Sequence, residues 1–184
     1  NDLVEISEKK PYPVINEVYP NPDLDINGDG DTAQDDEFVE LFNPSDTDLE
    51  LKDYSLSDNT GTYTIPNKTI RAGSHLTLGR WETGLVLGRD DQVTLCDQNG
   101  SIIDHFEFRD AGKGDCYQRS PDGNERWISG AKPTPGLENS DPPSFIINEV
   151  LPDPEGSNSG NQWLELKNTG PDWNIEGFVL TNHD

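Results

Sequence analysis

Basic side chains are scarce in this 184-residue sequence. Lys and Arg number 13 against 36 Asp and Glu, which gives a formal net charge of −23. Proteins that bind nucleic acid contact its phosphates through Lys and Arg, and no basic cluster stands out here. Long apolar runs are also missing, whereas a membrane-spanning helix needs about 20 such residues. We therefore expect neither nucleic-acid binding nor membrane insertion.

Methionine is absent and cysteine occurs only twice. A chain without Met at position 1 is expected to be an internal fragment, a mature product or a trimmed chain. Cys96 and Cys116 form an even pair, which fits one disulfide in an oxidising compartment, and two free thiols are the alternative. The acidity fits either a calcium-rich extracellular setting or a high-salt cytoplasm.

Turn-forming residues are abundant, with 17 Gly and 14 Pro. Short runs of β-branched and aromatic residues lie between them at spacings of about 8–12, which is typical of all-β domains. No segment keeps a helical period, and the Asp-Gln-Asn-Gly sequence at 97–100 predicts a hairpin turn. The predicted strands are residues 14–19, 37–43, 53–57, 63–65, 75–79, 92–97, 101–107 and 115–119.

The two ends of the chain repeat each other. Ile-Asn-Glu-Val at 15–18 recurs at 147–150, and each copy is followed by Pro-x-Pro. A polar, Pro-rich stretch between the copies is typical of a linker. The predicted organisation is an N-terminal segment at 1–13, a complete domain at 14–139, a linker at 140–145 and the truncated first third of a second copy at 146–184.

Several short motifs follow one another in the first copy in a specific order and spacing. They include Ile-Asn-Glu-Val at 15–18, Phe-Val-Glu-Leu at 38–41, Ile-Asp at 103–104, Tyr-Gln-Arg at 117–119 and Pro-Thr-Pro-Gly at 133–136. Together they resemble the lamin tail domain family over residues 14–139, and residues 146–184 resemble the first third of that family.

The resemblance implies an immunoglobulin-like β-sandwich, in agreement with the predicted strands. For a prokaryotic member it implies a non-catalytic module, often repeated or attached to secreted or surface enzymes, with an unknown protein or cell-surface ligand. The link of animal nuclear lamins to DNA does not carry over well, because this chain lacks a basic surface.

The first loop of the complete copy carries oxygen-bearing side chains at alternate positions. Such groups at positions 1, 3 and 5, with Gly at position 6, are typical of a calcium loop of EF-hand type. Position 12 holds Asp36, where a bidentate Glu is usual. The alternative is a solvated acidic turn between strands. The candidate ligands of Ca²⁺ are Asp25, Asn27, Asp29, Asp31, Asp36 and Glu37.

No catalytic residue is predicted. Glu17 and Glu40 form a possible acid–base pair, but we expect strand-end carboxylates that accept hydrogen bonds from the backbone or from Arg. The three His residues lack metal-ligand spacing and are expected to be ordinary strand or terminal residues. Trp81 and Trp173 are candidates for an exposed surface that stacks on sugars.

These patterns favour a non-catalytic module of a larger extracellular or cell-surface protein that acts in binding, attachment or domain spacing. The alternative is a carbohydrate-binding accessory module of a secreted hydrolase. The apolar residues of the partial second copy lack most of their module, so we expect them to pack on the first copy or on a second chain. Self-association through residues 146–184 is therefore predicted.

Overall fold

The computed structural model describes residues 10–139, 145–153, 161–169 and 180–181. The chain divides into two compact units, residues 1–140 and 141–184. The linker predicted at 140–145 lies almost wholly outside the described residues.

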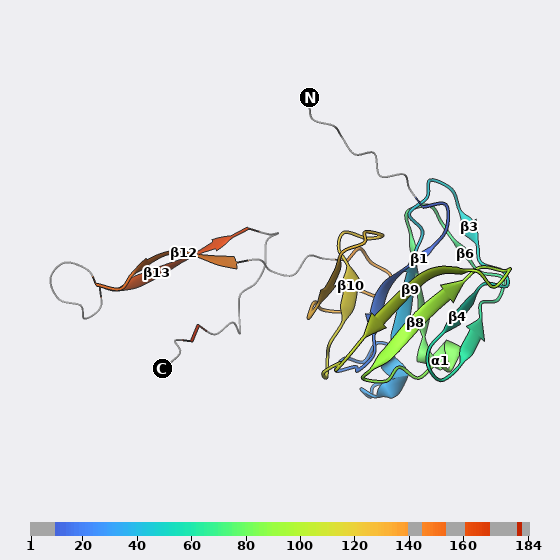
Figure 1. Ribbon diagram of the computed structural model, residues 1–184. Coiled ribbons are helices and arrows are strands. Elements are labelled where there is room, and N and C mark those ends of the chain that lie inside the picture. Colours follow the sequence, from blue (N-terminus) through green and yellow to red (C-terminus); the bar gives the residue numbers. More distant parts are fainter. Residues whose placement is uncertain (1–9, 140–144, 154–160, 170–179, 182–184) are drawn as a thin grey trace, which may run out of the picture. The chain divides into compact units, whose positions relative to one another are not determined.

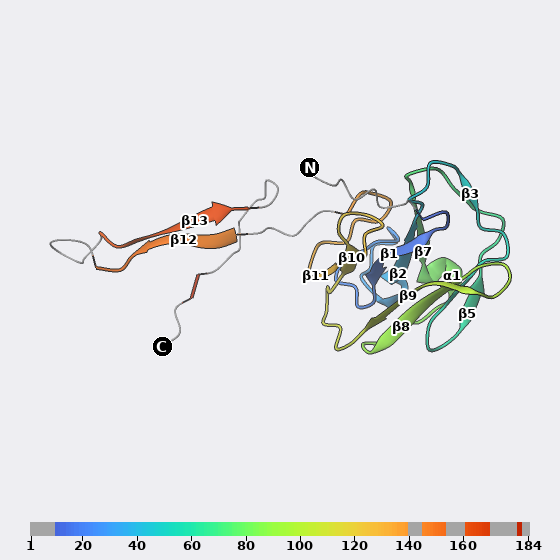
Figure 2. The ribbon, with the colours of Figure 1, turned by 45° about the horizontal axis from the view of Figure 1, so that its top comes forward.

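Two antiparallel sheets face each other in the first unit (Figures 1 and 2). The first has the strand order β11-β10-β1-β2-β7, the second has the order β5-β4-β8-β9, and β3 pairs with β6 beside them. The helices in the described residues are the short α1 (Arg80–Thr83) and η1 (Gln34–Asp36). This arrangement confirms the predicted all-β, immunoglobulin-like sandwich. The strands are β1 (Val14–Tyr19), β2 (Phe38–Phe42), β3 (Leu49–Glu50), β4 (Ser55–Ser57), β5 (Thr62–Thr64), β6 (Thr69–Ile70), β7 (His75–Gly79), β8 (Asp91–Cys96), β9 (Ile102–Phe108), β10 (Tyr117–Arg119) and β11 (Trp127–Ser129).

The core lies between the two sheets and is built from side chains that alternate along the strands. In β8, Val93 and Leu95 are fully buried, whereas Gln92 is exposed. Successive residues of a strand point to opposite faces, so β8 turns one face inward. Ile15 and Leu41 of the first sheet join the same cluster. Every residue of β1 is buried, so the centre of the first sheet is covered on both faces.

The hairpin predicted at 97–100 is confirmed. The backbone N–H of Asp97 donates to the carbonyl of Ser101 at 2.9 Å, and that of Gly100 donates to the carbonyl of Asp97 at 3.0 Å. Gly100 has a φ of 79°, a conformation that glycine adopts without steric cost. The turn joins β8 to β9, and the ladder of the two strands shifts register between Leu95 and Cys96, close to the turn.

The second unit contains a hairpin in which β12 (Phe145–Leu151) pairs with β13 (Trp163–Asn168). Its ladder shifts register at 147–149, and the ladder of β1 and β2 shifts at the corresponding place, 15–17. The two hairpins therefore share one pairing pattern. The exposed apolar side chains of the second unit's described residues include Ile146, Ile147, Val150, Trp163, Leu164, Leu166 and Leu180.

The predicted disulfide between Cys96 and Cys116 is wrong, because both residues are free thiols. Tyr117, next to Cys116, stacks on Phe108 with ring centroids 5.2 Å apart, and Phe108 pairs with Asp91 at the beginning of β8. Cys96 stands at the other end of β8. A strand rises about 3.3 Å per residue, so most of the length of β8 separates the two thiols. A bridge needs Cα atoms within about 7 Å.

Candidate functional site

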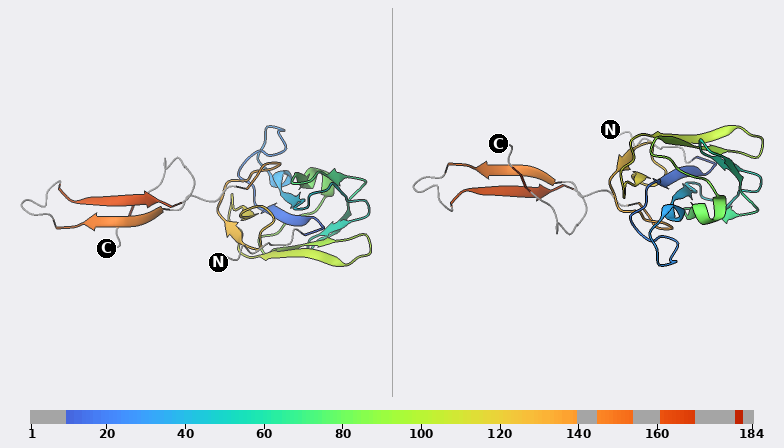
Figure 3. Two further views of the ribbon diagram at one scale, coloured as in Figure 1. Left: turned by 90° about the horizontal axis from the view of Figure 1, so that it is seen from above. Right: turned by 90° about the horizontal axis from the view of Figure 1, so that it is seen from below.

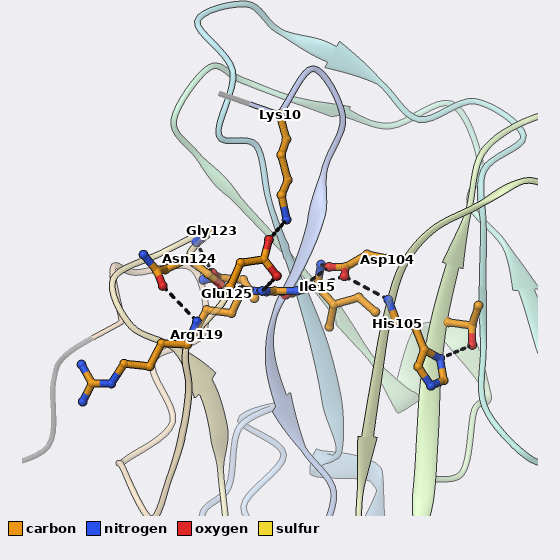
Figure 4. A network of polar contacts seen from close by, with 11 residues as sticks. Lys10, Ile15, Asp104, His105, Arg119, Gly123, Asn124 and Glu125 are labelled. Carbon is orange, nitrogen blue, oxygen red and sulfur yellow. Dashed lines mark hydrogen bonds and ion pairs between the residues drawn. The ribbon is translucent and has the colours of Figure 1, made fainter. Parts of the chain in front are cut away.

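A buried arginine joins the two sheets (Figure 4). The Nη2 of Arg119 in β10 donates to both carboxylate oxygens of Asp104 in β9, at 2.9 and 3.0 Å. Its Nε donates to the carbonyl of Ile15 at 2.6 Å, and its Nη1 donates to that of Asn124 at 2.5 Å. The N–H of Ile15 also donates to Asp104, at 2.8 Å. One guanidinium thus holds β1, β9 and the loop after β10 together.

Aromatic rings close the same junction. The guanidinium carbon of Arg119 lies 4.8 Å from the ring centroid of Trp127, within the range of cation–π attraction. Phe106 stacks on Trp127 with centroids 3.7 Å apart. Arg119 is only 2% exposed, so water and salt screen its ion pair weakly. Arg119 of the Tyr-Gln-Arg motif and Asp104 of the Ile-Asp motif therefore help to hold the two sheets together.

A row of polar side chains crosses the first sheet on the face that points away from the core. Gln118, Glu17, Glu40 and Thr77 are successive cross-strand neighbours on β10, β1, β2 and β7. Directly opposite residues of antiparallel strands share a face. Gln118, Glu17 and Glu40 are fully buried. Residues 130–139, here called the strap, cover this face of the sheet and form hydrogen bonds with them.

Glu17 is fully bonded within this row. Its Oε1 accepts from the Sγ of Cys116 at 2.9 Å, from the Nε2 of Gln118 at 2.9 Å and from the N–H of Thr134 at 2.8 Å. Its Oε2 accepts from the Oγ1 of Thr134 at 3.1 Å. Burial raises the pKa of Glu17, although these hydrogen bonds act in the opposite direction. The carboxylate fastens the strap to β1 and β10.

Glu40 has fewer donors. Its Oε2 accepts from the Oγ1 of Thr77 at 2.8 Å and from the N–H of Gly136 at 2.5 Å. Its Oε1 is buried with no hydrogen-bond partner among the described residues. Burial raises the pKa of Glu40 to about 7, and the negative charge of Glu17 adds to this effect. The expectation that both glutamates accept structural hydrogen bonds is confirmed, but their donors include side chains and the strap, not Arg.

His75 borders the same row on β7. Its Nε2 lies 2.7 Å from the Oδ2 of Asp122. Burial alone would lower the pKa of His75, but the bond to Asp122 and the charge of Glu40 outweigh it and raise the pKa. Burial would raise the pKa of Asp122, but hydrogen bonds from His75 and Asn16 lower it. The pair therefore favours an imidazolium next to a carboxylate, which the sequence did not predict.

The predicted calcium loop follows β1 and projects from the sandwich as the blue loop in Figure 3. The Asp25 carboxylate accepts from the N–H of Gly30 at 3.0 Å. The side-chain oxygen of Asn27 accepts from the N–H of Asp29, and that of Asp29 from the N–H of Asp31, both at 2.9 Å. Gly30 has a φ of 97°, as the sharp turn requires. The alternate side chains thus organise the loop's backbone.

Asp36 closes the loop from its far end. Its Oδ1 accepts from the N–H groups of Ile26 at 2.7 Å and Asn27 at 3.0 Å, and its Oδ2 accepts from Ala33 at 2.9 Å. The side chain is fully buried. Burial acts to raise the pKa of Asp36, but the three backbone donors lower it. Asp36 therefore stays ionised at neutral pH.

Glu37 faces away from the loop. Its Oε1 accepts from the Nη1 of Arg80 at 3.1 Å, and its Oε2 accepts from the N–H of Leu87 at 2.9 Å. Burial raises the pKa of Glu37 to about 7 against the effect of both donors. Its two oxygens hold α1 and the segment after it, so Glu37 is engaged outside the loop, and its role as a calcium ligand stays a prediction.

In the part of the chain that the structure describes, no group of three or more His, Cys, Asp and Glu side chains is arranged to hold a metal ion. Calcium loops also draw ligands from amide and backbone carbonyl oxygens, which here are those of Asn27 and Asp31. Calcium binding at the loop therefore stays a prediction.

The aromatic candidates do not gather on one surface. Trp81 is the exposed aromatic of the first unit's described residues, and its ring covers Gly79. Trp127 is engaged at the junction of the sheets. Trp173 lies outside the described residues. A sugar-stacking surface needs two or three coplanar rings, so the structure does not favour the carbohydrate-binding alternative.

A hollow of about 600 Å³ opens beside Phe42 and Pro44. Asp122 contributes to its wall, but the carboxylate is already bonded to His75 and to the Nδ2 of Asn16. The buried polar groups near the hollow therefore serve the fold.

No helix among the described residues is long and apolar enough to cross a membrane. A search of curated proteins finds no match. The model of the Lamin Tail Domain family matches residues 7–110, which is more than half of the chain. The match runs through β1–β9, and β10 and β11 beyond it complete the first sheet. With its immunoglobulin-like sandwich, the chain belongs to the lamin tail domain family.

Proposed function

We propose that this chain is a non-catalytic lamin-tail module of a larger extracellular or cell-surface protein, where it acts in binding, attachment or spacing of domains. The observation that carries the proposal is how the motif side chains are used. Arg119, Asp104 and Glu17 form hydrogen bonds that link neighbouring strands and the backbone. The motifs that resemble the family therefore stabilise the fold.

The surroundings in which this module works are proposed from its charge. A net charge of −23 favours a protein or cell-surface ligand over nucleic acid, and it suits a calcium-containing medium. Cys96 and Cys116 are free thiols, so no disulfide between them supports an oxidising compartment. The extracellular location therefore rests on acidity and on the first loop.

We further propose that the first loop binds one Ca²⁺ in a structural role. The side chains of Asp25, Asn27, Asp29 and Asp36 and the carbonyl of Asp31 are the proposed ligands. Each carboxylate oxygen has two lone pairs. Among the described residues, the Oδ2 of Asp36 accepts one hydrogen bond, from the N–H of Ala33, so it keeps a lone pair for the ion.

Isothermal titration calorimetry with CaCl₂ tests the loop, with MgCl₂ as the ionic control. We expect a dissociation constant of about 10⁻⁴–10⁻³ M, the range of extracellular calcium modules. Asp29→Ala, which removes a ligand oxygen, should weaken binding, whereas Glu50→Gln, a change at an exposed position outside the loop, should not. Absence of calcium-specific heat, or equal binding by Asp29→Ala, would leave the loop as an acidic turn.

Residues 146–184 are proposed to begin a second lamin-tail copy. The shared register shift of the two hairpins and the exposed apolar side chains of β12 and β13 support this reading. We propose that these side chains pack on a second chain. Sedimentation velocity should show association that Trp163→Ser weakens. A monomer at all concentrations, with rapid proteolysis of this segment alone, would contradict the proposal.

A further inference from the structure

The strap is held to the first sheet by hydrogen bonds outside any strand pairing, since no described residue of 130–139 belongs to a strand. At its end, the Nδ2 of Asn139 donates to the carbonyls of Asn16 and Arg119. In its middle, the N–H of Thr134 donates to Glu17 and the N–H of Gly136 donates to Glu40. The attachment of the middle of the strap therefore depends on the state of these two carboxyl groups.

Glu17 and Glu40 are direct cross-strand partners, and both are fully buried. The nearest positive group is His75, which lies 2.7 Å from Asp122 and is already offset by it. Two buried carboxyl groups side by side, without an unpaired positive charge nearby, disfavour the state in which both are ionised. The titratable groups facing the pair are His75 from β7, Cys116 before β10, Asp122 after it and, at the exposed surface of the strap, Lys132 and Glu138.

The hydrogen bonds assign a proton to Glu40. Both oxygens of Glu17 accept from donors, which stabilises its ionised form. The Oε1 of Glu40 has no donor among the described residues, and a buried charged oxygen without a donor is costly. Burial raises the pKa of Glu40 to about 7, so the proton is held in acid and lost near neutrality.

We propose that the strap is a proton-controlled clasp, closed on the first sheet while the Glu17–Glu40 pair keeps one proton and loosened when that proton leaves to solvent. Loss of the proton places a second negative charge under residues 130–139. The strap is the part that yields, because the strands beneath it are held by ladders on both sides. Asn139, at the end of the strap, stays bonded to the carbonyls of Asn16 and Arg119, so the loosening is confined to the middle of the strap.

Amide hydrogen exchange of the full chain tests the clasp. Protection of the Thr134 and Gly136 amides, corrected for intrinsic exchange rates, should fall at least about tenfold between about pH 5.5 and about pH 8, a factor that corresponds to one pKa unit. The amide of Leu95 in β8 is the internal reference. Glu40→Gln should keep the strap protected at both values, and the control His75→Gln should keep the pH dependence.

Protection that does not change with pH, or a pH dependence that survives in Glu40→Gln, would overturn the proposal. If Glu40→Gln fails to fold, the carboxyl carbon shift of Glu40 in the unmodified chain decides. A titration midpoint that matches the loss of strap protection supports the clasp. A midpoint at the ordinary glutamate pKa of about 4.3 contradicts it.

Discussion

Arg119 and Asp104 lie on different sheets of the sandwich, and a shared ion pair at 2.9 and 3.0 Å joins them in a nearly dry junction. Breaking a buried pair by removing one partner leaves an uncompensated charge. Arg119→Met should therefore lower the free energy of unfolding by about 3–5 kcal/mol, measured by urea denaturation.

The matched control is Arg109→Met. Arg109 also contacts a carboxylate, that of Glu107 at 2.6 Å, but both side chains are exposed. Its loss should change the free energy of unfolding by no more than about 0.5 kcal/mol. Equal effects of the two substitutions would show that the junction does not hold the sheets together.

The pair of His75 and Asp122 predicts a stability that declines as the pH rises above the ordinary histidine pKa of about 6.5. The pKa of His75 is raised in the folded state, so its contribution is full below the unfolded value of about 6.5 and is lost as pH rises through the folded value. Free energies of unfolding measured across this interval should fall with pH. His75→Gln should flatten the fall, and the exposed His105→Gln should not.

The two thiols should differ in reactivity. Cys116 is fully buried and donates to Glu17 at 2.9 Å, and burial raises its pKa well above that of a free thiol. Thiolates are the reactive form, so a thiol reagent should label Cys96 in the folded chain and Cys116 only after unfolding. Intact mass before and after denaturation checks this. Labelling of neither cysteine in denaturant would instead reveal a disulfide.

The first loop should depend on Asp36 with or without calcium. Three backbone N–H groups lose their acceptor in Asp36→Ala, and an unsatisfied donor costs about 1–3 kcal/mol where water cannot replace the bond. We expect a loss of at least about 1 kcal/mol in the free energy of unfolding and faster proteolysis within the loop. The control Asp35→Ala removes a half-buried carboxylate that, among the described residues, accepts from the Asn27 side chain. Equal proteolysis of both variants would show that Asp36 does not close the loop.

Much of the sandwich could be predicted because turn residues and alternation are local signals. The bounds of β1 and β7 agree with the prediction. Each end of the other predicted strands lies within two residues of its predicted position. The unpredicted strands β3, β6 and β11 have two or three residues, too few to show a period.

The buried row could not be predicted, because it depends on register. Gln118 and Glu17 are 101 positions apart and meet only through the pairing of β10 with β1, in which a slip by one residue would turn each side chain to the other face. The disulfide prediction failed for a related reason, since strand order across sheets separates Cys96 from Cys116. The bonds within the first loop join residues close in sequence and could be expected from it, whereas the contact of Glu37 with Arg80 joins residues 43 positions apart.

The measurement that tests the proposed function most directly is a calcium titration of the isotope-labelled chain followed by amide NMR signals. We expect saturable shifts at Gly28, Gly30 and Asp31, lost in Asp29→Ala, with little change in the strap. Unchanged loop signals, or weak shifts spread evenly over the acidic surface, would contradict it.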